Sequence, residues 1–285
     1  MKFILYNPLS GNGSSKKIAE SYAEKTDGSK LVDITGIEDF SSFVAGLSTD
    51  DAMYIFGGDG TINRFVNAVD CSDIKCDVFY YPSGTGNDFC VDVDKQGVTE
   101  PFRINEYITD LPAVTVKGKD YKFINGIGFG IDGYCCEVGD IVKHSGKVPN
   151  YTTIAIKGLL FHFKPRVAVV TVDGVSTEFK KVWIAPTMFG RHYGGGMIPT
   201  PDQSRESGNV SLMVFHGGGR ISTLIVFPSI FKGKHVLKKK RVSVFEGKEI
   251  TVKFDRPTPL QIDGETILDV TEYTVKANAR KKTTV

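Results

Sequence analysis

The stretch MYIFGGDGTINRFVNAV, from Met53 to Val69, decides how the first part of this 285-residue chain is expected to fold. Its apolar start predicts a buried strand, and TINRFVNAV (Thr61–Val69) predicts a helix. Between them, GGDGT (Gly57–Thr61) leaves the backbone almost bare and carries a single carboxylate. A strand, a glycine-rich turn and a helix in this order are typical of an anion site, because unpaired N–H groups gather where the helix begins.

The residues around this stretch repeat the alternation of strand and helix. That order predicts a parallel sheet with helices on both faces, as in a Rossmann-like α/β domain. Ser14 is the expected cap of the first helix. The predicted strands cover 2–6, 30–34, 52–56 and 78–81, and the predicted helices cover 14–26, 37–47 and 61–69.

Runs of β hairpins replace this pattern after about Leu111. Alternating apolar residues between turn residues predict hairpins at 113–126 and 167–186, and helices are expected only at 151–163 and 221–231. Hairpins that follow an α/β half indicate a separate C-terminal domain, which we expect to be a β-sandwich.

The domain boundary is predicted near residue 112, with an α/β domain at 1–112 and a β-sandwich domain at 113–269. The last strand-like segment, EYTVKAN (Glu272–Asn278), could pair with either sheet. Residues from about 270 to 285 could therefore complete the first domain.

The composition excludes several classes of protein. The 35 basic and 33 acidic residues nearly balance, which does not support nucleic-acid binding. The five cysteines form no CxxC pair and are an odd number, so reduced thiols are expected rather than a disulfide framework or a zinc site. The sequence shows neither a signal peptide nor an apolar run long enough to span a membrane, and a cytoplasmic protein is predicted.

Three polar, glycine-rich loops are expected at one edge of the first sheet. NPLSG (Asn7–Gly11), GGDGT and PSGTGND (Pro82–Asp88) follow the first, third and fourth predicted strands. Ligands of α/β sheets bind at the carboxyl ends of the strands, so the three loops together predict a nucleotide polyphosphate site. The Walker pattern is absent, and GIGFGIDG (Gly126–Gly133) lies outside the βαβ half, which disfavours P-loop and Rossmann dehydrogenase folds.

These motifs recur in one known family. NPLSG, GGDGTINRFVNAV, PSGTGNDF, GIGFGID, GGGM (Gly194–Met197) and QIDGE (Gln261–Glu265) follow one another in this order. The chain resembles the diacylglycerol kinase catalytic-domain family, which includes sphingosine kinases and soluble bacterial lipid kinases. GGDGT alone is shared with NAD kinases and phosphofructokinases, whereas its combination with PSGTGNDF and a late DGE is more specific.

The resemblance implies that ATP lies in the cleft between the two domains, and it assigns residues to ATP and to Mg²⁺. The first domain would then bind the nucleotide, and the second would hold the lipid acceptor and the catalytic groups. Asp59 and Asp88 look like the aspartates that organise Mg²⁺, and Glu206 is a weaker metal candidate because Glu206-Ser207-Gly208-Asn209 keeps only one carboxylate of the family's Asp-Asp-Gly stretch. The implied nucleotide-binding residues are Asn7, Pro8, Ser10, Gly11, Thr35, Gly57, Gly58, Asp59, Gly60, Thr61, Asn63, Gly84, Thr85, Asn87 and Asp88.

The catalytic base is implied to be Glu265 or Asp263, and the sequence leaves this choice open. Phosphoryl transfer depends mainly on positioning and on neutralisation of charge, which N–H cradles and a divalent cation supply. A carboxylate beside the acceptor hydroxyl would take its proton. Asp263-Gly264 is also a common sequence for an ordinary hairpin turn.

The expected activity is the transfer of the γ-phosphoryl group of ATP to a lipid hydroxyl, with diacylglycerol giving phosphatidic acid for phospholipid synthesis. One alternative is a kinase of a soluble acceptor, related to NAD kinases or phosphofructokinases. The other is a nucleotide-binding regulator that has lost catalysis, which Asn12 favours because relatives often have lysine there.

The expected partner is a lipid at the membrane surface. The basic run KGKHVLKKKR (Lys232–Arg241) could attract anionic headgroups or could simply be a solvated face. GLLFHF (Gly158–Phe163) could line an acyl-chain cleft or belong to the core. The resemblance is compatible with a homodimer, which the sequence itself does not reveal.

Overall fold

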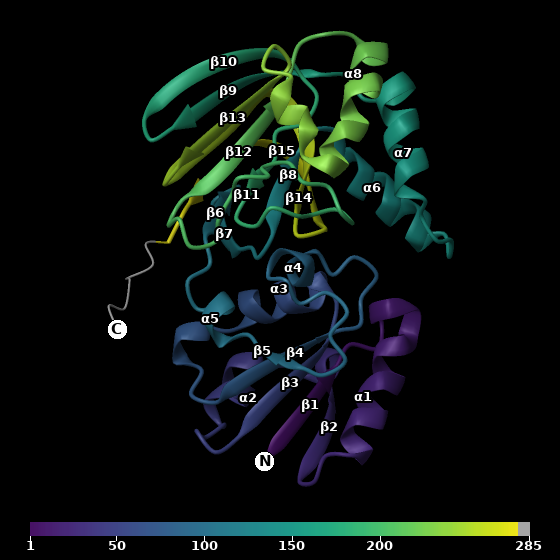
Figure 1. Cartoon of the computed structure of the whole chain (residues 1–285), viewed down its shortest axis with the longest axis vertical. Coiled ribbons are helices and arrows are strands. Elements are labelled where there is room, and N and C mark those ends of the chain that lie inside the picture. The colour runs from purple at the N-terminus through teal and green to yellow at the C-terminus, as the bar shows by residue number, and fades with distance from the viewer. Residues whose placement is uncertain (279–285) are drawn as a thin grey trace. The chain divides into compact units, whose positions relative to one another are not determined.

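The computed structural model describes residues 1–278, and the chain divides into two compact units at Leu111–Pro112 (Figure 1). The first unit contains a sheet with the strand order β2-β1-β3-β4-β5. β1 to β4 are parallel and β5 runs antiparallel to β4, which confirms the predicted α/β class. The strands are β1 (Lys2–Tyr6), β2 (Ser29–Asp33), β3 (Ala52–Gly57), β4 (Asp77–Pro82) and β5 (Phe102–Arg103).

Helices cover both faces of this sheet because successive strand residues point to opposite sides. Ile4 and Tyr6 of β1 pack with the helix α1, whereas the ring of Phe3 meets Phe43 of α2 edge-on at 5.5 Å. Ser14 is not the cap of α1: the cap is Gly13, and the Ser14 hydroxyl donates to the carbonyl of the preceding turn. The helices are α1 (Ser14–Glu24), α2 (Phe40–Ala45), α3 (Asp59–Ala68), α4 (Asp88–Asp92) and α5 (Asn105–Ile108).

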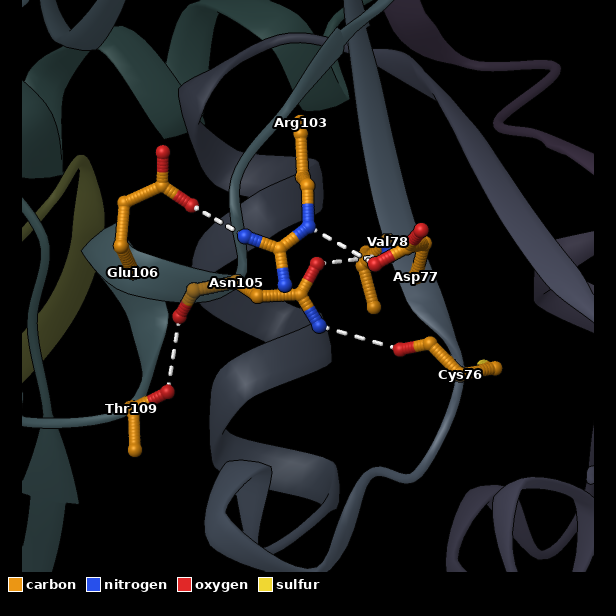
Figure 2. Close-up of polar contacts among 7 residues, drawn as sticks. All are labelled: Cys76, Asp77, Val78, Arg103, Asn105, Glu106 and Thr109. Atoms are coloured by element: carbon orange, nitrogen blue, oxygen red, sulfur yellow. Dashed lines mark hydrogen bonds and ion pairs between the residues drawn. The ribbon is translucent and has the colours of Figure 1, made fainter. Parts of the chain in front are cut away.

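A group of polar side chains closes the β4–β5 edge of the sheet (Figure 2). Asn105 accepts a hydrogen bond from the Val78 N–H and donates one to the Cys76 carbonyl. Arg103 reaches Asp77 and Glu106 at 2.7 and 3.1 Å, on the exposed side. Exposed ion pairs contribute little stability, so the amide of Asn105 is the stronger tie between α5 and the start of β4.

The second unit is built from antiparallel strands and confirms the predicted β-sandwich-like domain. β14 organises it: its end pairs with β8 on one side, its start pairs with β9, and β15 runs alongside. A register shift in β14 between Lys253 and Thr258 separates these two pairings. The strands are β6 (Ala113–Val116), β7 (Lys119–Lys122), β8 (Gly126–Phe129), β9 (Arg166–Val172), β10 (Val175–Val182), β11 (Thr187–Met188), β12 (Val210–Phe215), β13 (Val242–Gly247), β14 (Glu249–Ile262) and β15 (Glu265–Lys276).

The predicted last strand is part of β15, which pairs with β14 and β6 in the second sheet. Residues 270–276 therefore do not extend the first sheet. The remainder of the 270–285 prediction reaches beyond the described residues.

The expectation of only two helical stretches in the second half is wrong. α6 (Ile131–His144) is a 14-residue helix that follows directly after β8. Its start, IDGYCC, contains a glycine and two cysteines, whose low helix propensity hid the periodicity. The predicted helix at 151–163 forms as α7 (Tyr151–Lys157) and a π-helical turn (Gly158–His162), and the one at 221–231 forms as α8 (Arg220–Val226) and a 3₁₀ turn (Phe227–Lys232).

These helices pack onto the second sheet around Trp183, which is 1% exposed. Ile131 of α6, Leu159 of the π turn and Met213 of β12 belong to the same cluster. All five cysteines are free, as predicted. No helix within the described residues is both long and apolar enough to cross a membrane.

Candidate active site

The three glycine-rich loops of the first unit meet at the carboxyl edge of the sheet, because β1, β3 and β4 are neighbours. A Cβ on Gly84 would lie 2.5 Å from the Cα of Gly58, and a Cβ on Gly58 would lie 3.6 Å from the Ser10 hydroxyl oxygen. A Cβ on Gly11, at a φ of 58°, would collide with the Ser83 carbonyl oxygen. The glycines are needed because backbone meets backbone here.

Buried polar side chains hold these loops together. The Asn7 amide donates to the Thr61 hydroxyl at 3.1 Å, which joins the first loop to GGDGT. The Ser83 hydroxyl donates to Ser15, and Ser15 donates to the carbonyl of Phe56 at the end of β3. Sequence reasoning missed Ser15 and Ser83, because a serine gives no signal until the fold buries it.

Asp59 links the second loop to the third. It begins α3, and its two carboxylate oxygens accept hydrogen bonds from the backbone N–H groups of Asp88 and Phe89 at 2.9 and 3.0 Å. These are unpaired donors at the first turn of α4, so Asp59 satisfies the start of a helix that lies 29 residues along the chain.

Asp88, which is 5% exposed, points to the same place as Asp59. A Cβ on Gly86 would lie 3.6 Å from an oxygen of each carboxylate. Two carboxylates that keep further lone pairs suit Mg²⁺, which retains waters and takes its other ligands from phosphates. Within residues 1–278 no cluster of three or more His, Cys, Asp or Glu side chains converges, so these two carboxylates would need phosphate oxygens to complete the shell.

The other predicted nucleotide residues occupy varied positions. Asn87 adopts a left-handed conformation with φ of 52° and exchanges two hydrogen bonds with the backbone of Gly84, while Thr85 beside it is exposed. Asn63 is buried and accepts from Asn67 in the next turn of α3. Thr35 is exposed after the edge strand β2, where its hydroxyl and N–H donate to Asp33.

The predicted catalytic pair lies at the tip of the β14–β15 hairpin in the second unit. Asp263 and Gly264 form its two-residue loop with φ of 47° and 96°, between the paired Ile262 and Glu265. Asp263 accepts hydrogen bonds from three consecutive N–H groups, those of residues 124, 125 and 126, at 2.6 to 2.9 Å. The hairpin-turn interpretation is therefore correct for Asp263-Gly264.

Glu265 is the free carboxylate of this pair. It is exposed at the first position of β15, and its side chain makes no hydrogen bond or ion pair with the rest of the described chain. Asp263 is committed to the backbone of residues 124–126, whereas Glu265 is available to a ligand.

Comparison with known proteins identifies this combination. Residues 2–110 match the family model of the diacylglycerol kinase catalytic domain, and residues 125–278 match that of the YegS C-terminal NAD kinase beta sandwich-like domain. The second match alone covers more than half of the chain. The chain belongs to the family defined by the YegS C-terminal NAD kinase beta sandwich-like domain, here preceded by a diacylglycerol kinase catalytic domain.

Similar family members include a Mycobacterium tuberculosis protein named diacylglycerol kinase. It is 26% identical over 269 residues, which cover 87% of this chain and 84% of the relative. A solved structure titled as a diacylglycerol kinase of Bacillus anthracis superposes with a TM-score of 0.61 at 17% identity, over 98% of this chain and 94% of the other. The fold is thus shared at full length, and family membership makes this chain a nucleotide-dependent phosphotransferase of the lipid-kinase type.

The metal stretch that the resemblance predicts in the second domain lies around Glu206. Glu206 is exposed, and its N–H bonds to Ser204. The side-chain amide of Gln203, 6% exposed, donates to the carbonyls of Phe189, Ser204 and Asn209 at 2.9 to 3.3 Å. N–H donors thus satisfy carbonyl oxygens that could otherwise contact a cation, which does not favour a metal at Glu206.

Proposed function

We propose that this chain transfers the γ-phosphoryl group of ATP to a lipid hydroxyl, with diacylglycerol as the acceptor and phosphatidic acid as the product. The observation that carries the proposal is the division of roles between two carboxylate sites. Asp59 and Asp88 converge beside glycine-rich N–H groups, whereas Glu265 is free at the tip of a rigid hairpin. The first arrangement suits a polyphosphate and the second suits a general base.

The nucleotide would bind the loop cluster through the N–H group of Gly58 and the hydroxyl of Ser10, beside the Gly84 turn that Asn87 holds in place. Mg²⁺ held by Asp59 and Asp88 would neutralise charge on the phosphates. Glu265 would accept the proton of the acceptor hydroxyl as its oxygen forms a bond to the γ-phosphorus. The bond from the γ-phosphorus to the bridging oxygen breaks, and ADP leaves with that electron pair.

The test is an acceptor screen with labelled ATP and Mg²⁺. The acceptors are diacylglycerol, ceramide, sphingosine and undecaprenol in mixed micelles, and NAD in solution. Label in phosphatidic acid is the expected result. Label only in another lipid would overturn the choice of diacylglycerol, and label only in NAD would favour a kinase of a soluble acceptor. ATP binding without labelled product would favour a regulator.

We also propose that the chain reaches its lipid by contacting an anionic membrane through the face around α8. Ile221 and Ile225, one helical turn apart, are 72% and 74% exposed and line a groove with Leu160. Phe161, beside Leu160 in the π turn, is 70% exposed. Apolar side chains this exposed and this close together are typical of interaction surfaces.

The neighbouring charge favours an anionic lipid surface. Arg241 donates to the hydroxyls of Ser222 and Thr223 at 3.0 and 2.9 Å, which places the end of the basic run against the first turn of α8. Lys238, Lys239 and Lys240 precede it and are exposed. Each basic side chain near an anionic membrane contributes about 1 kcal/mol.

Vesicle sedimentation tests this contact without any catalysis. Binding to phosphatidylcholine vesicles that contain phosphatidylglycerol is expected, with loss of binding in the double variant Ile221→Ser/Ile225→Ser. Val175→Ser is the matched control, because Val175 is also 72% exposed but lies on the β9–β10 hairpin. Equal binding of both variants, or no binding by the unmodified protein, would contradict the proposed surface.

A further inference from the structure

A buried carboxylate lies in the first turn of α6, outside the residues assigned so far. Asp132 is 8% exposed, and burial raises its pKa to about 6 from 3.8. A Cβ on Gly128 would overlap its carboxylate. The glycine of β8 therefore leaves the space that this side chain occupies, in the segment GIGFGID.

A chain of two hydrogen bonds connects Asp132 to the hairpin that carries Glu265. The Gln261 amide nitrogen donates to Asp132 at 2.9 Å, and the Gln261 amide oxygen accepts from the Gly264 N–H at 2.6 Å. Gln261 is 2% exposed, so both bonds are shielded from water. Because the Gln261 amide nitrogen donates to Asp132, the Gln261 amide oxygen is the end that faces Gly264.

The titratable groups around Asp132 are few. The hydroxyl of the buried Tyr193 faces it, and burial raises the pKa of that hydroxyl well above its usual value. Cys135 and Cys136 follow on α6, and burial raises the pKa of both thiols. These groups are neutral at physiological pH, so Asp132 has no cationic partner among them and its ionised form depends on the Gln261 donor.

We propose that Asp132 is a positioning residue for Glu265: through Gln261 it orients the Gly264 peptide and so sets where the following carboxylate points. This inference rests on the proposed role of Glu265 as the base. Asp263 has a φ of 47°, which only glycine adopts at little cost, and two restraints hold the turn. Asp263 supplies one through residues 124–126, and the Asp132–Gln261 pair supplies the other.

The experiment exchanges the hydrogen-bond donor and acceptor between Asp132 and Gln261. Gln261→Glu puts two carboxylates face to face and removes the donor to Asp132, so the turn is expected to loosen. Adding Asp132→Asn restores a donor opposite an acceptor, because the new amide can donate to the new carboxylate. The matched control is Asp140→Asn, which alters another α6 carboxylate whose partners are Thr266 of β15 and the exposed Lys143.

Two readouts are measured on all variants. Hydrogen exchange at the Gly264 amide is expected to be at least tenfold faster in Gln261→Glu, and near the original rate in the double variant and in the control. With labelled ATP and diacylglycerol, kcat is expected to fall at least tenfold in Gln261→Glu with the KM for ATP unchanged, and to recover in the double variant.

Unchanged exchange in Gln261→Glu would overturn the positioning role, whether or not the protein is active. Faster exchange that the double variant does not reverse would also overturn it, since the defect would then be general. If exchange responds as expected while Glu265→Gln keeps full activity, the hydrogen bonds from Asp132 through Gln261 to Gly264 have a structural role only. The assignment of Glu265 as the base would then be overturned, and Asp132 would have no catalytic role.

Discussion

Each unit contains an Asp-Gly pair whose aspartate accepts hydrogen bonds from backbone N–H groups, but the two aspartates lie in different structural settings. Asp59 accepts two backbone N–H bonds from the start of α4, and Asp263 accepts three from residues 124–126. Asp59 follows a parallel strand and begins a helix, so its carboxylate lies at a helix start, the kind of place that suits phosphate. Asp263 lies in a hairpin turn, and the carboxylate that we propose as the base is Glu265, two residues later.

The difference shows that an aspartate in a conserved-looking motif can have a structural task before any chemical one. In the first unit the structural task and the proposed ligand-binding task fall on one side chain, that of Asp59. In the second unit they are divided between Asp263, which is bonded to the backbone, and Glu265, which is free. Five predictions test this division, from the largest expected effect to the smallest.

Glu265→Gln is expected to lower kcat by about 10²–10⁴-fold, because it removes the proposed base while keeping the shape of the side chain. ATP affinity should stay unchanged, since the nucleotide loops belong to the first unit. Steady-state kinetics with diacylglycerol and a separate ATP-binding titration check both parts. Near-normal kcat would remove Glu265 from the mechanism.

Asp132→Asn is expected to stabilise the protein at neutral pH. The carboxyl binds its proton more tightly when folded, with a pKa of about 6 against 3.8, so stability is lost as the pH rises from about 4 through 6. Above pH 7 the full cost is about 3 kcal/mol, which asparagine avoids while its oxygen can still accept from Gln261.

Urea unfolding followed by the fluorescence of Trp183, the single tryptophan, measures this effect in the second unit. The free energy of unfolding of Asp132→Asn should exceed that of the unmodified protein at pH 8 and should equal it near pH 4. A stability difference that does not change with pH would show that Asp132 is not the titrating group.

Asp263→Asn and Asp59→Asn compare the two aspartates directly. The amide keeps one acceptor oxygen and turns its NH₂ group towards backbone donors, so bonds are lost at both sites. Asp263→Asn should lower the free energy of unfolding by about 2–3 kcal/mol, and Asp59→Asn, with two bonds, by about 1–2 kcal/mol. Trp183 fluorescence should report the unfolding of Asp263→Asn, and circular dichroism should report that of Asp59→Asn. A larger loss of stability in Asp59→Asn than in Asp263→Asn would contradict the difference in the number of hydrogen bonds.

Gly84→Ala is expected to weaken ATP binding by about 10-fold, or about 1.4 kcal/mol, because the new Cβ would push the third loop away from Gly58. Gly36→Ala is the matched control, since a Cβ there meets nothing within 4 Å. Calorimetric titration with ATP and Mg²⁺ separates the two variants. Equal affinities would show that the loop contact does not shape the site.

Chelation with EDTA should leave the unfolding of the second unit unchanged, because the Gln203 amide already satisfies the carbonyls beside Glu206. Thermal unfolding followed by Trp183 fluorescence measures this. A fall in Tm on chelation would show that a metal binds there after all.

Sequence patterns were sufficient to place the three glycine-rich loops of the first unit, because each loop is a local unit. Each glycine-rich loop follows its own strand, and neighbouring parallel strands bring the loops to one edge. The start of α6 was missed because its glycine and cysteines obscure the helical period. Ser15 and Ser83 could not be found, since their bond joins residues 68 positions apart.

By itself the sequence determined the two domains' classes, the three loops and the family, since these depend on periodicity and on motifs read within a few residues. Only the tertiary structure decided which hydrogen-bond partners each carboxylate has. The donors to Asp263 lie about 138 residues away, and Gln261 meets Asp132 across 129 residues. Hydrogen bonds at such separations exist only after the strands have paired, so no local pattern contains them.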